Sequence, residues 1–437
     1  MLVCTSTSCL SRQSSFLKTV SSCTILFYFN HVFSKRPQAK VVTTTTTTTT
    51  TTEDNGRKDE QQATKNRFKP YKELSKWNLS CLNGFVTGST AFVSSGGYLP
   101  VSVSAMIGCI SLATSASALN QLQEHPFDRQ MNRTRLKRPL CNGQLTAIQA
   151  KAFITLSMAT GCYTLATYCG TVSALIGMST ILLYNVIYTP LKRLTPYNTE
   201  FGAIVGAFPP QIGIAASHWK EHPTAPVMDI FVNTINDPLC WFTFALLYVW
   251  QMPHFLYLSI RNKQDYIRGG FRMWSHNLYD NANNTRCKKK SFYWSLCLPV
   301  LPLGLSYAGA TSYMFALDGG LLSLAYVTSV YRWYRNTDSH SNHALGKTSF
   351  LFNLMYLPFI LLLMLIHSKR WKYQPGKGGG GGGSFIIYTY MMLFVFTLCP
   401  CTGSFWSTHL AWLQDQGIYW CPWDNTSKQP SDLPSEM

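Results

Sequence analysis

Residues 101–119 read VSVSAMIGCISLATSASAL and lead directly into residues 120–143, which read NQLQEHPFDRQMNRTRLKRPLCNG. About 20 apolar residues are enough for a helix to cross a bilayer, so the first run predicts a membrane-spanning helix. Asn120, Glu124 and Asp128 recur at i, i+4 and i+8 and therefore share one face of that helix in its last turns. The sequence thus predicts oxygen-bearing side chains at the edge of a membrane.

The second half of the polar stretch is basic, with Arg129, Arg133, Arg135, Lys137 and Arg138. Mg²⁺ prefers carboxylate and phosphate oxygens, and Arg pairs bidentately with phosphate. Oxygen ligands followed by a guanidinium-rich loop therefore suit a magnesium-bridged diphosphate, and we interpret the stretch as half of such a site. Pro126 lacks a backbone donor, so we expect the helix to kink or end there, with Asp128 reaching the metal from a loop.

Composition supports a membrane protein rather than a nucleic-acid-binding one. The 437 residues carry a net charge of +18 because acids are scarce, with 19 Asp and Glu against 37 Lys and Arg. The basic residues cluster at the ends of apolar runs, as the positive-inside rule expects, so we expect no nucleic-acid partner. The 14 cysteines show neither the spacing of a zinc site nor that of a disulfide framework.

The apolar runs predict an all-α membrane protein, a bundle of about nine transmembrane helices. The first, fifth and eighth are the weakest, being short, glycine-rich or polar at one end. The candidate spans are approximately 78–99, 101–120, 148–169, 171–189, 200–217, 239–260, 291–314, 318–335 and 349–367.

Both ends of the chain differ in composition from this domain, which we place at 78–371. Residues 1–52 contain no acidic residue and end in a threonine run, which favours a mitochondrial transit peptide and spacer over a secretory signal. Residues 53–77 are a polar lead-in. Residues 372–437 form a glycine-rich linker and a divergent tail, in which 385–405 is either a tenth span or an interfacial segment.

The distribution of basic residues predicts the topology. The basic segments after the second, fourth, sixth and eighth spans fall on one side, which behind a transit peptide is the matrix. We therefore expect a multi-pass protein of the mitochondrial inner membrane whose site faces the matrix. Lys369, Arg370 and Lys372 follow the ninth span and break the pattern.

Two further blocks make a family resemblance specific. YTPLKR (188–193) leads into NTEFGAIVGAFPPQIG (198–213), and the sixth span ends in WQMPHFLYLSIRNKQDYIRGG (250–270). Together with 120–143, and in this order, these blocks resemble the haem O synthase branch of the UbiA intramembrane prenyltransferases. The similarity covers about 78–367, and it implies a helical bundle around a central cavity with two polar motifs facing each other at its mouth.

The resemblance also implies roles for individual residues. Asn120, Glu124, Asp128 and Asp265 would be catalytic and hold Mg²⁺. Arg133, Arg138, Lys192, Arg193 and Arg268 would bind the phosphates, and Tyr188, Gln251 and Tyr266 complete the expected substrate-binding set. His254 would also be catalytic, by ligating haem iron, orienting a water or otherwise binding substrate, although a lone histidine is commonly an ordinary polar residue at the membrane edge. Gln264 stands where the family often has an acid, which puts a second metal ion in doubt.

The function implied is transfer of a farnesyl group from farnesyl diphosphate to a vinyl group of haem B, giving haem O. The expected partners are these two substrates, the lipid bilayer, and a haem A synthase or other cytochrome oxidase assembly factors. A UbiA enzyme acting on an aromatic quinone precursor is the nearest alternative. A transporter is a further alternative, but it would place acids near mid-membrane. Asp128 and Asp265 instead lie at span ends.

Overall fold

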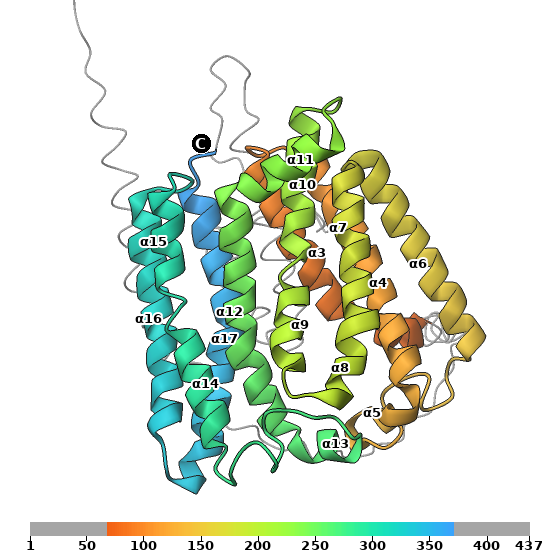
Figure 1. Ribbon diagram of the computed structural model, residues 1–437, viewed down its shortest axis with the longest axis vertical. Helices are drawn as coiled ribbons and strands as arrows, with labels where there is room; N and C mark the ends of the chain where they lie inside the picture. The colour runs from red at the N-terminus through yellow and green to blue at the C-terminus, as the bar shows by residue number, and fades with distance from the viewer. Residues whose placement is uncertain (1–67, 371–437) are drawn as a thin grey trace, which may run out of the picture. The chain divides into compact units, whose positions relative to one another are not determined.

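The computed structural model describes residues 68–370, and these are helical, as the apolar runs predict (Figure 1). In this part of the chain the one β-type pairing is an isolated bridge between Thr311 and Ser368. The predicted transit peptide and spacer (1–52), most of the lead-in and the tail from 372 lie outside the described residues. The helices are α3 (Trp77–Ser94), α4 (Leu99–Asp128), α5 (Asn132–Arg135), α6 (Ala147–Tyr168), α7 (Thr171–Leu182), η1 (Leu183–Tyr188), α8 (Thr189–Leu194), α9 (Asn198–Gly206), α10 (Pro209–Glu221), α11 (Val227–Asn236), α12 (Pro238–Arg261), α13 (Lys263–Arg268), α14 (Thr285–Ser295), α15 (Val300–Tyr307), α16 (Tyr313–Arg335) and α17 (Ser339–His367).

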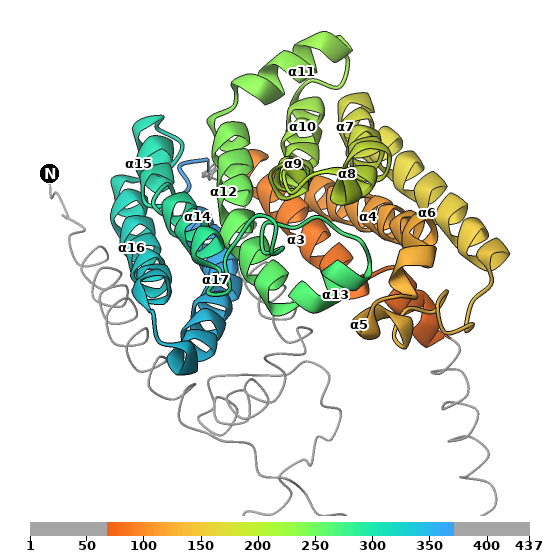
Figure 2. The same cartoon turned by 60° about the horizontal axis from the view of Figure 1, so that its bottom comes forward.

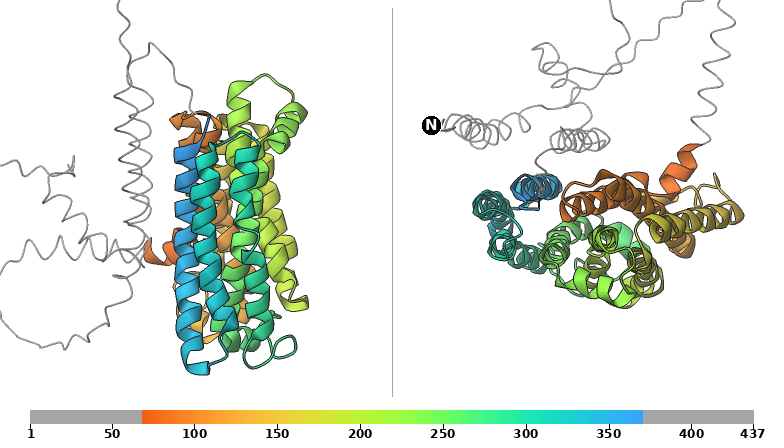
Figure 3. Two further views of the ribbon diagram at one scale, coloured as in Figure 1. Left: turned by 90° about the vertical axis from the view of Figure 1, so that its left-hand side faces the viewer. Right: turned by 90° about the horizontal axis from the view of Figure 1, so that it is seen from above.

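Each predicted span falls on helical residues, and the long helices run side by side (Figure 3). Within the described residues, 5 helical segments are long and apolar enough to cross a membrane. They are Leu99–Asp128, Thr171–Leu194, Pro238–Arg261, Tyr313–Arg335 and Ser341–His367. The all-α membrane fold is therefore confirmed, whereas the count of nine transmembrane helices stays a prediction.

The fifth and seventh predicted spans are each broken into two helices. In the fifth, α9 ends at Gly206 and α10 begins at Pro209, whose ring cannot donate the backbone hydrogen bond that would continue a helix. Helix α3 packs closely against this break, because Thr87 Oγ1 donates to the Pro209 carbonyl at 2.8 Å. A side chain at Gly213 would come within 2.2 Å of the Thr87 carbonyl oxygen, so glycine permits the approach.

The helix after α7 contains a π-helical turn, η1, before it continues as α8. A π-turn adds a residue to the helical repeat and is common at functional sites. Here it sets Tyr184 and Tyr188 with their ring centroids 5.3 Å apart, directly ahead of Lys192. The turn therefore shapes the wall next to a predicted phosphate-binding residue.

At the opposite end of the bundle, Asp237 binds several helices together. Its Oδ1 caps α12 by accepting from the Leu239 N–H at 2.9 Å, and Arg370 donates to both of its oxygens, at 2.6 and 2.8 Å. His218 lies 3.1 Å from Oδ2. Burial alone would raise the pKa of Asp237, but the hydrogen bonds from His218 and Arg370 outweigh it and lower the pKa to about 2. Arg370, one of the basic residues that depart from the predicted one-sided distribution of positive charge, is thus ion-paired.

Candidate functional site

The acid face predicted on the second span exists, and it lies on the last turns of α4. Asn120 and Asp128 are fully buried and Glu124 is 4% exposed. The sequence predicted that the helix would kink or end at Pro126. It does not end there, because α4 continues to Asp128, so the expectation that Asp128 reaches the metal from a loop is wrong. Pro126 falls in the final turn, where its missing N–H removes a single hydrogen bond and the Arg129 N–H still bonds to the His125 carbonyl at 3.3 Å.

Every member of this face contacts a basic side chain. Lys192 Nζ donates to Glu124 Oε1 at 2.7 Å, and Arg138 pairs with Asp128 Oδ2 while lying 3.7 Å from Glu124 Oε2. These contacts join the first polar motif to the YTPLKR block, as the predicted site requires. Charge-assisted pairs of this kind are costly to leave unmade in a buried setting.

Asn120 is hydrogen-bonded to Lys76, a cation that was not predicted to belong to the site. Lys76 Nζ donates to Asn120 Oδ1 at 3.2 Å, while Asn120 Nδ2 donates to Thr189 Oγ1 at 3.0 Å. Lys76 has φ 47° and ψ 50°, in the left-handed region that costs a non-glycine residue about 1–2 kcal/mol. Strain of this size is often retained at functional sites. A lysine-rich lead-in was visible in the sequence, but the backbone conformation that directs Lys76 inward was not.

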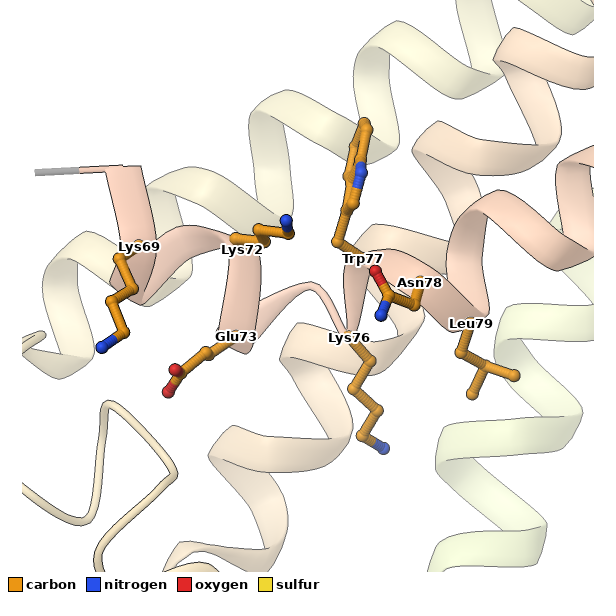
Figure 4. Close-up of a pocket in the computed structure, with 7 residues that line it drawn as sticks. All are labelled: Lys69, Lys72, Glu73, Lys76, Trp77, Asn78 and Leu79. Atoms are coloured by element: carbon orange, nitrogen blue, oxygen red, sulfur yellow. The ribbon is translucent and has the colours of Figure 1, made fainter. Parts of the chain in front are cut away.

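Lys76 also borders a pocket of about 540 Å³ at the start of α3 (Figure 4). The ammonium group of Lys76 points away from Trp77 in this view, and Lys69 and Lys72 lie on the preceding turns. The residues that line this pocket are Lys69, Lys72, Glu73, Lys76, Trp77, Asn78 and Leu79. Lys76 and Leu79 also line the cavity that lies between α4, α7, α9, α10 and α12, so these two residues separate the pocket from that cavity.

Two tyrosines of η1 surround the Lys192 ammonium. Its Nζ lies 4.6 Å from the ring centroid of Tyr188 and 5.8 Å from that of Tyr184. Tyr188 in turn packs on Gly202 of α9, where a Cβ would come within 2.6 Å of the ring. Lys192 is therefore held by a carboxylate and by aromatic faces together.

The second polar motif contacts the first one through the backbone of α5. Asp265 on α13 accepts the N–H groups of Asn132 and Arg133, each at 3.2 Å, and Arg268 Nη1 donates to it at 3.3 Å. Figure 2 shows α13 beside α5. In residues 68–370 no three His, Cys, Asp or Glu side chains group as a metal site, so Asp265 does not join Glu124 and Asp128 in this arrangement.

A cavity of about 430 Å³ opens beside these motifs and continues between α4, α7, α9, α10 and α12. Its walls are apolar below the charged mouth, with side chains such as Leu112, Ile181, Ile212 and Phe255. The predicted site residues that line it are Asn120, Glu124, Arg133, Arg138, Tyr188, Lys192, Gln251, His254 and Tyr266. Asp128, Arg193, Asp265 and Arg268 are not among the lining residues.

Arg133, Arg193 and Gln251 are placed by contacts of other kinds. The Arg133 guanidinium lies 5.7 Å from the Tyr266 ring centroid, and that of Arg193 lies 4.1 Å from the ring centroid of Phe127. Gln251 Nε2 donates to the Leu247 carbonyl at 2.9 Å. Arg133 therefore lines the cavity beside Tyr266, whereas Arg193 packs against Phe127 near the end of α4.

The donor set on α4 fits a hard divalent cation. An amide oxygen and two carboxylates lie on one helix face, and Asp128 Oδ1 is buried without a hydrogen-bond partner. An unpaired buried carboxylate oxygen is costly unless a ligand satisfies it. Oxygen donors of this kind suit Mg²⁺ carried in with phosphate groups. Asn120, Glu124 and Asp128 thus meet the requirement, and Asp265 is occupied with α5.

Comparison with known proteins supports the resemblance seen in the sequence. The profile of the UbiA prenyltransferase family matches residues 82–355. "Protoheme IX farnesyltransferase, mitochondrial" of Arabidopsis thaliana is 33% identical over 303 residues, covering 68% of this chain and 64% of the relative. The Homo sapiens protein of the same name is 31% identical over 294 residues, covering 67% and 60%. The chain therefore spans less than two thirds of the length of these relatives.

The fold is shared with solved structures. The apo structure of a UbiA homologue from Aeropyrum pernix K1 superposes with a TM-score of 0.52 at 17% identity, covering 66% of this chain and 98% of that one. Identity this low supports the fold alone, whereas the family profile spans more than half of the chain. This chain belongs to the UbiA prenyltransferase family.

Proposed function

We propose that this protein transfers the farnesyl group of farnesyl diphosphate to a vinyl group of haem B and so makes haem O. The observation that carries the proposal is the joining of a buried acid face, a set of cations and an apolar cavity at one end of the bundle. The names of the relatives identify the acceptor class, since several are protoheme IX farnesyltransferases. The prenyltransferase domain would extend over 78–371.

The cations would bind the diphosphate. Lys76, Arg138 and Lys192 meet at the α4 face, where they exceed the two carboxylates by one positive charge, and Arg133 adds another at the cavity wall. When the allylic C–O bond breaks, its electron pair leaves with the diphosphate, and fixed cations stabilise that charge as it develops. Mg²⁺ held by Asn120, Glu124 and Asp128 would neutralise part of the diphosphate charge.

The remaining walls would protect the farnesyl cation until the vinyl group attacks. Apolar side chains exclude water from the cavity, and the faces of Tyr184 and Tyr188 offer electron density to a cation. The vinyl carbon forms the new C–C bond, and a water molecule then adds to the adjacent carbon and loses a proton. Keeping water away from the first step and admitting it to the second gives the hydroxyethylfarnesyl product.

We also propose a location, the mitochondrial inner membrane with the site facing the matrix. The basic residues Arg129, Arg133, Arg135, Lys137 and Arg138, with Lys192 and Arg193, lie at the site end of the bundle, and Arg370 at the other end pairs with Asp237. This asymmetry agrees with the positive-inside rule. The transit peptide and a haem A synthase or other assembly partner belong to the same proposal.

The test is product formation by the purified protein in lipid nanodiscs with Mg²⁺ and farnesyl diphosphate. Haem B and 4-hydroxybenzoate are supplied in separate reactions, and products are identified by mass spectrometry. We expect haem O from the first and no prenylated acid from the second. Product from the aromatic acid alone would make this a quinone-pathway enzyme and overturn the proposal.

A further inference from the structure

His254 on α12 and Asn353 on α17 form a hydrogen-bonded pair behind the wall of the central cavity. His254 Nδ1 lies 2.9 Å from Asn353 Oδ1, and Asn353 is buried at 1% exposure. His254 itself lines the cavity, whereas Asn353 does not. The pair therefore consists of a side chain at the cavity and a partner behind it.

The orientation of the Asn353 amide is fixed by the backbone carbonyl of Trp250, which can only accept a hydrogen bond. Its Nδ2 lies 3.2 Å from the Trp250 carbonyl oxygen, which can only accept, and 3.0 Å from the Tyr326 hydroxyl. The Trp250 indole N–H donates back to the Asn353 carbonyl at 2.8 Å, which holds the two helices in register. The amide nitrogen must therefore face Trp250 and Tyr326, and the amide oxygen must face His254.

This orientation determines which nitrogen of His254 carries the proton. An amide oxygen only accepts, so Nδ1 must be the donor, and in a neutral imidazole Nε2 then keeps its lone pair. Within the described residues Nε2 has no hydrogen-bond partner. The ring is further held by Trp250, stacked at 5.2 Å, and by Phe350 at 4.9 Å between centroids. A fixed ring thus presents an acceptor nitrogen at the wall of a mainly apolar cavity.

We propose that His254 Nε2 is an axial ligand to the iron of the haem substrate and that Asn353 is its positioning residue. The inference rests on the proposed function and deepens it. Metal-binding histidines characteristically donate their second ring N–H to a carbonyl or carboxylate, which fixes the tautomer and raises the basicity of the ligand. The amide oxygen of Asn353 occupies that place. Neither a diphosphate nor a prenyl chain offers a partner to a lone pair, whereas a porphyrin iron does.

The test uses the full-length protein in nanodiscs with haem B and without farnesyl diphosphate, so that binding is read apart from catalysis. The Soret and visible bands of ferric and reduced haem B report the axial ligand during a titration. We expect the unmodified protein to give a histidine-ligated spectrum. His254→Gly should lose it, and added imidazole should restore it.

Asn353→Leu should keep the fold but weaken haem B binding about 10–100-fold, the usual effect of removing such a supporting partner. It should also raise the imidazole concentration needed for rescue in the His254→Gly background. Ser323→Ala is the control, because Ser323 forms a buried hydrogen bond with Tyr356 at 2.8 Å between α16 and α17, the helices that carry Tyr326 and Asn353, without contacting His254. This control should bind haem B as the unmodified protein does.

The outcomes distinguish the axial-ligand role of His254 from the positioning role of Asn353. Haem B binding with an unchanged spectrum in His254→Gly overturns the axial ligand, and it leaves the proposed function standing if haem O still forms. Asn353→Leu matching Ser323→Ala in affinity and rescue overturns the positioning role. No haem B binding by the unmodified protein would overturn the proposed function and this inference with it.

Discussion

Replacing Lys192 by methionine tests the charged mouth of the cavity most directly. The substitution keeps the length of the side chain but removes the ammonium that lies 2.7 Å from Glu124, at a site where the two side chains are 12% and 5% exposed. Breaking a buried pair typically costs 3–5 kcal/mol, because the remaining charge is uncompensated. Arg138, 3.7 Å from the other Glu124 oxygen, offsets part of that loss. We therefore expect a loss of about 3 kcal/mol in the free energy of unfolding.

The same change should weaken binding of farnesyl diphosphate. A hydrogen bond to a charged group contributes about 1.5–3 kcal/mol, which corresponds to about 10–100-fold in Kd. Lys192→Arg is the matched control and should retain most of the affinity. The double variant Lys192→Met with Glu124→Gln removes both charges, so stability should return while diphosphate affinity stays low.

Isothermal titration with farnesyl diphosphate and thermal unfolding in detergent measure the two effects. If the double variant bound farnesyl diphosphate as tightly as the unmodified protein, Lys192 would only neutralise Glu124. An unchanged Kd in Lys192→Met alone would refute its assignment to the phosphates.

Three further outcomes are expected. Asp128→Asn should abolish haem O formation while the protein stays inserted in the membrane. Asp265→Asn retains an acceptor for the α5 N–H groups, so its rate of haem O formation should fall about tenfold or less. Equal losses of activity in a product assay would place Asp265 at the metal. Lys76→Gly relieves the left-handed backbone but also removes the ammonium that bonds to Asn120, so the two effects on stability should largely cancel while farnesyl diphosphate binding weakens; unchanged binding would remove Lys76 from the site. Asp237→Asn should lower the free energy of unfolding by about 2–3 kcal/mol at pH 7. The lowered pKa of Asp237 stabilises the fold above pH 4, and this contribution disappears as pH falls toward 2. Thermal unfolding of the unmodified protein and the variant should therefore show a smaller difference in stability at pH 3 than at pH 7.

The parts of the site that the sequence predicts are those encoded by local spacing. The i, i+4, i+8 pattern placed Asn120, Glu124 and Asp128 on one buried face, whereas the place of Lys192 beside them was implied by the family resemblance and not by local spacing. Composition was enough to predict helices, because apolar runs of this length have few alternatives in a bilayer.

Contacts between distant segments were not predictable. The partner of Asp265 is the backbone of α5, and nothing in its sequence neighbourhood distinguishes a residue that caps a helix from one that binds a metal. Lys76 was missed because its inward direction depends on a left-handed backbone angle. Pro126 was expected to kink or end its helix, but α4 continues to Asp128, because near a helix terminus the lost hydrogen bond matters little.

The pairing of Arg370 with Asp237 has a consequence for how the protein is made. Arg370 follows α17, and the groups that satisfy its guanidinium, Asp237 and Ser94, are synthesised long before it. Until the ends of α3 and α12 have come together, the positive charge of Arg370 at the end of α17 lacks the partners Asp237 and Ser94. Insertion of α17 is therefore coupled to tertiary assembly of the earlier helices, and a substitution at Asp237 should impair the insertion of α17 during biogenesis.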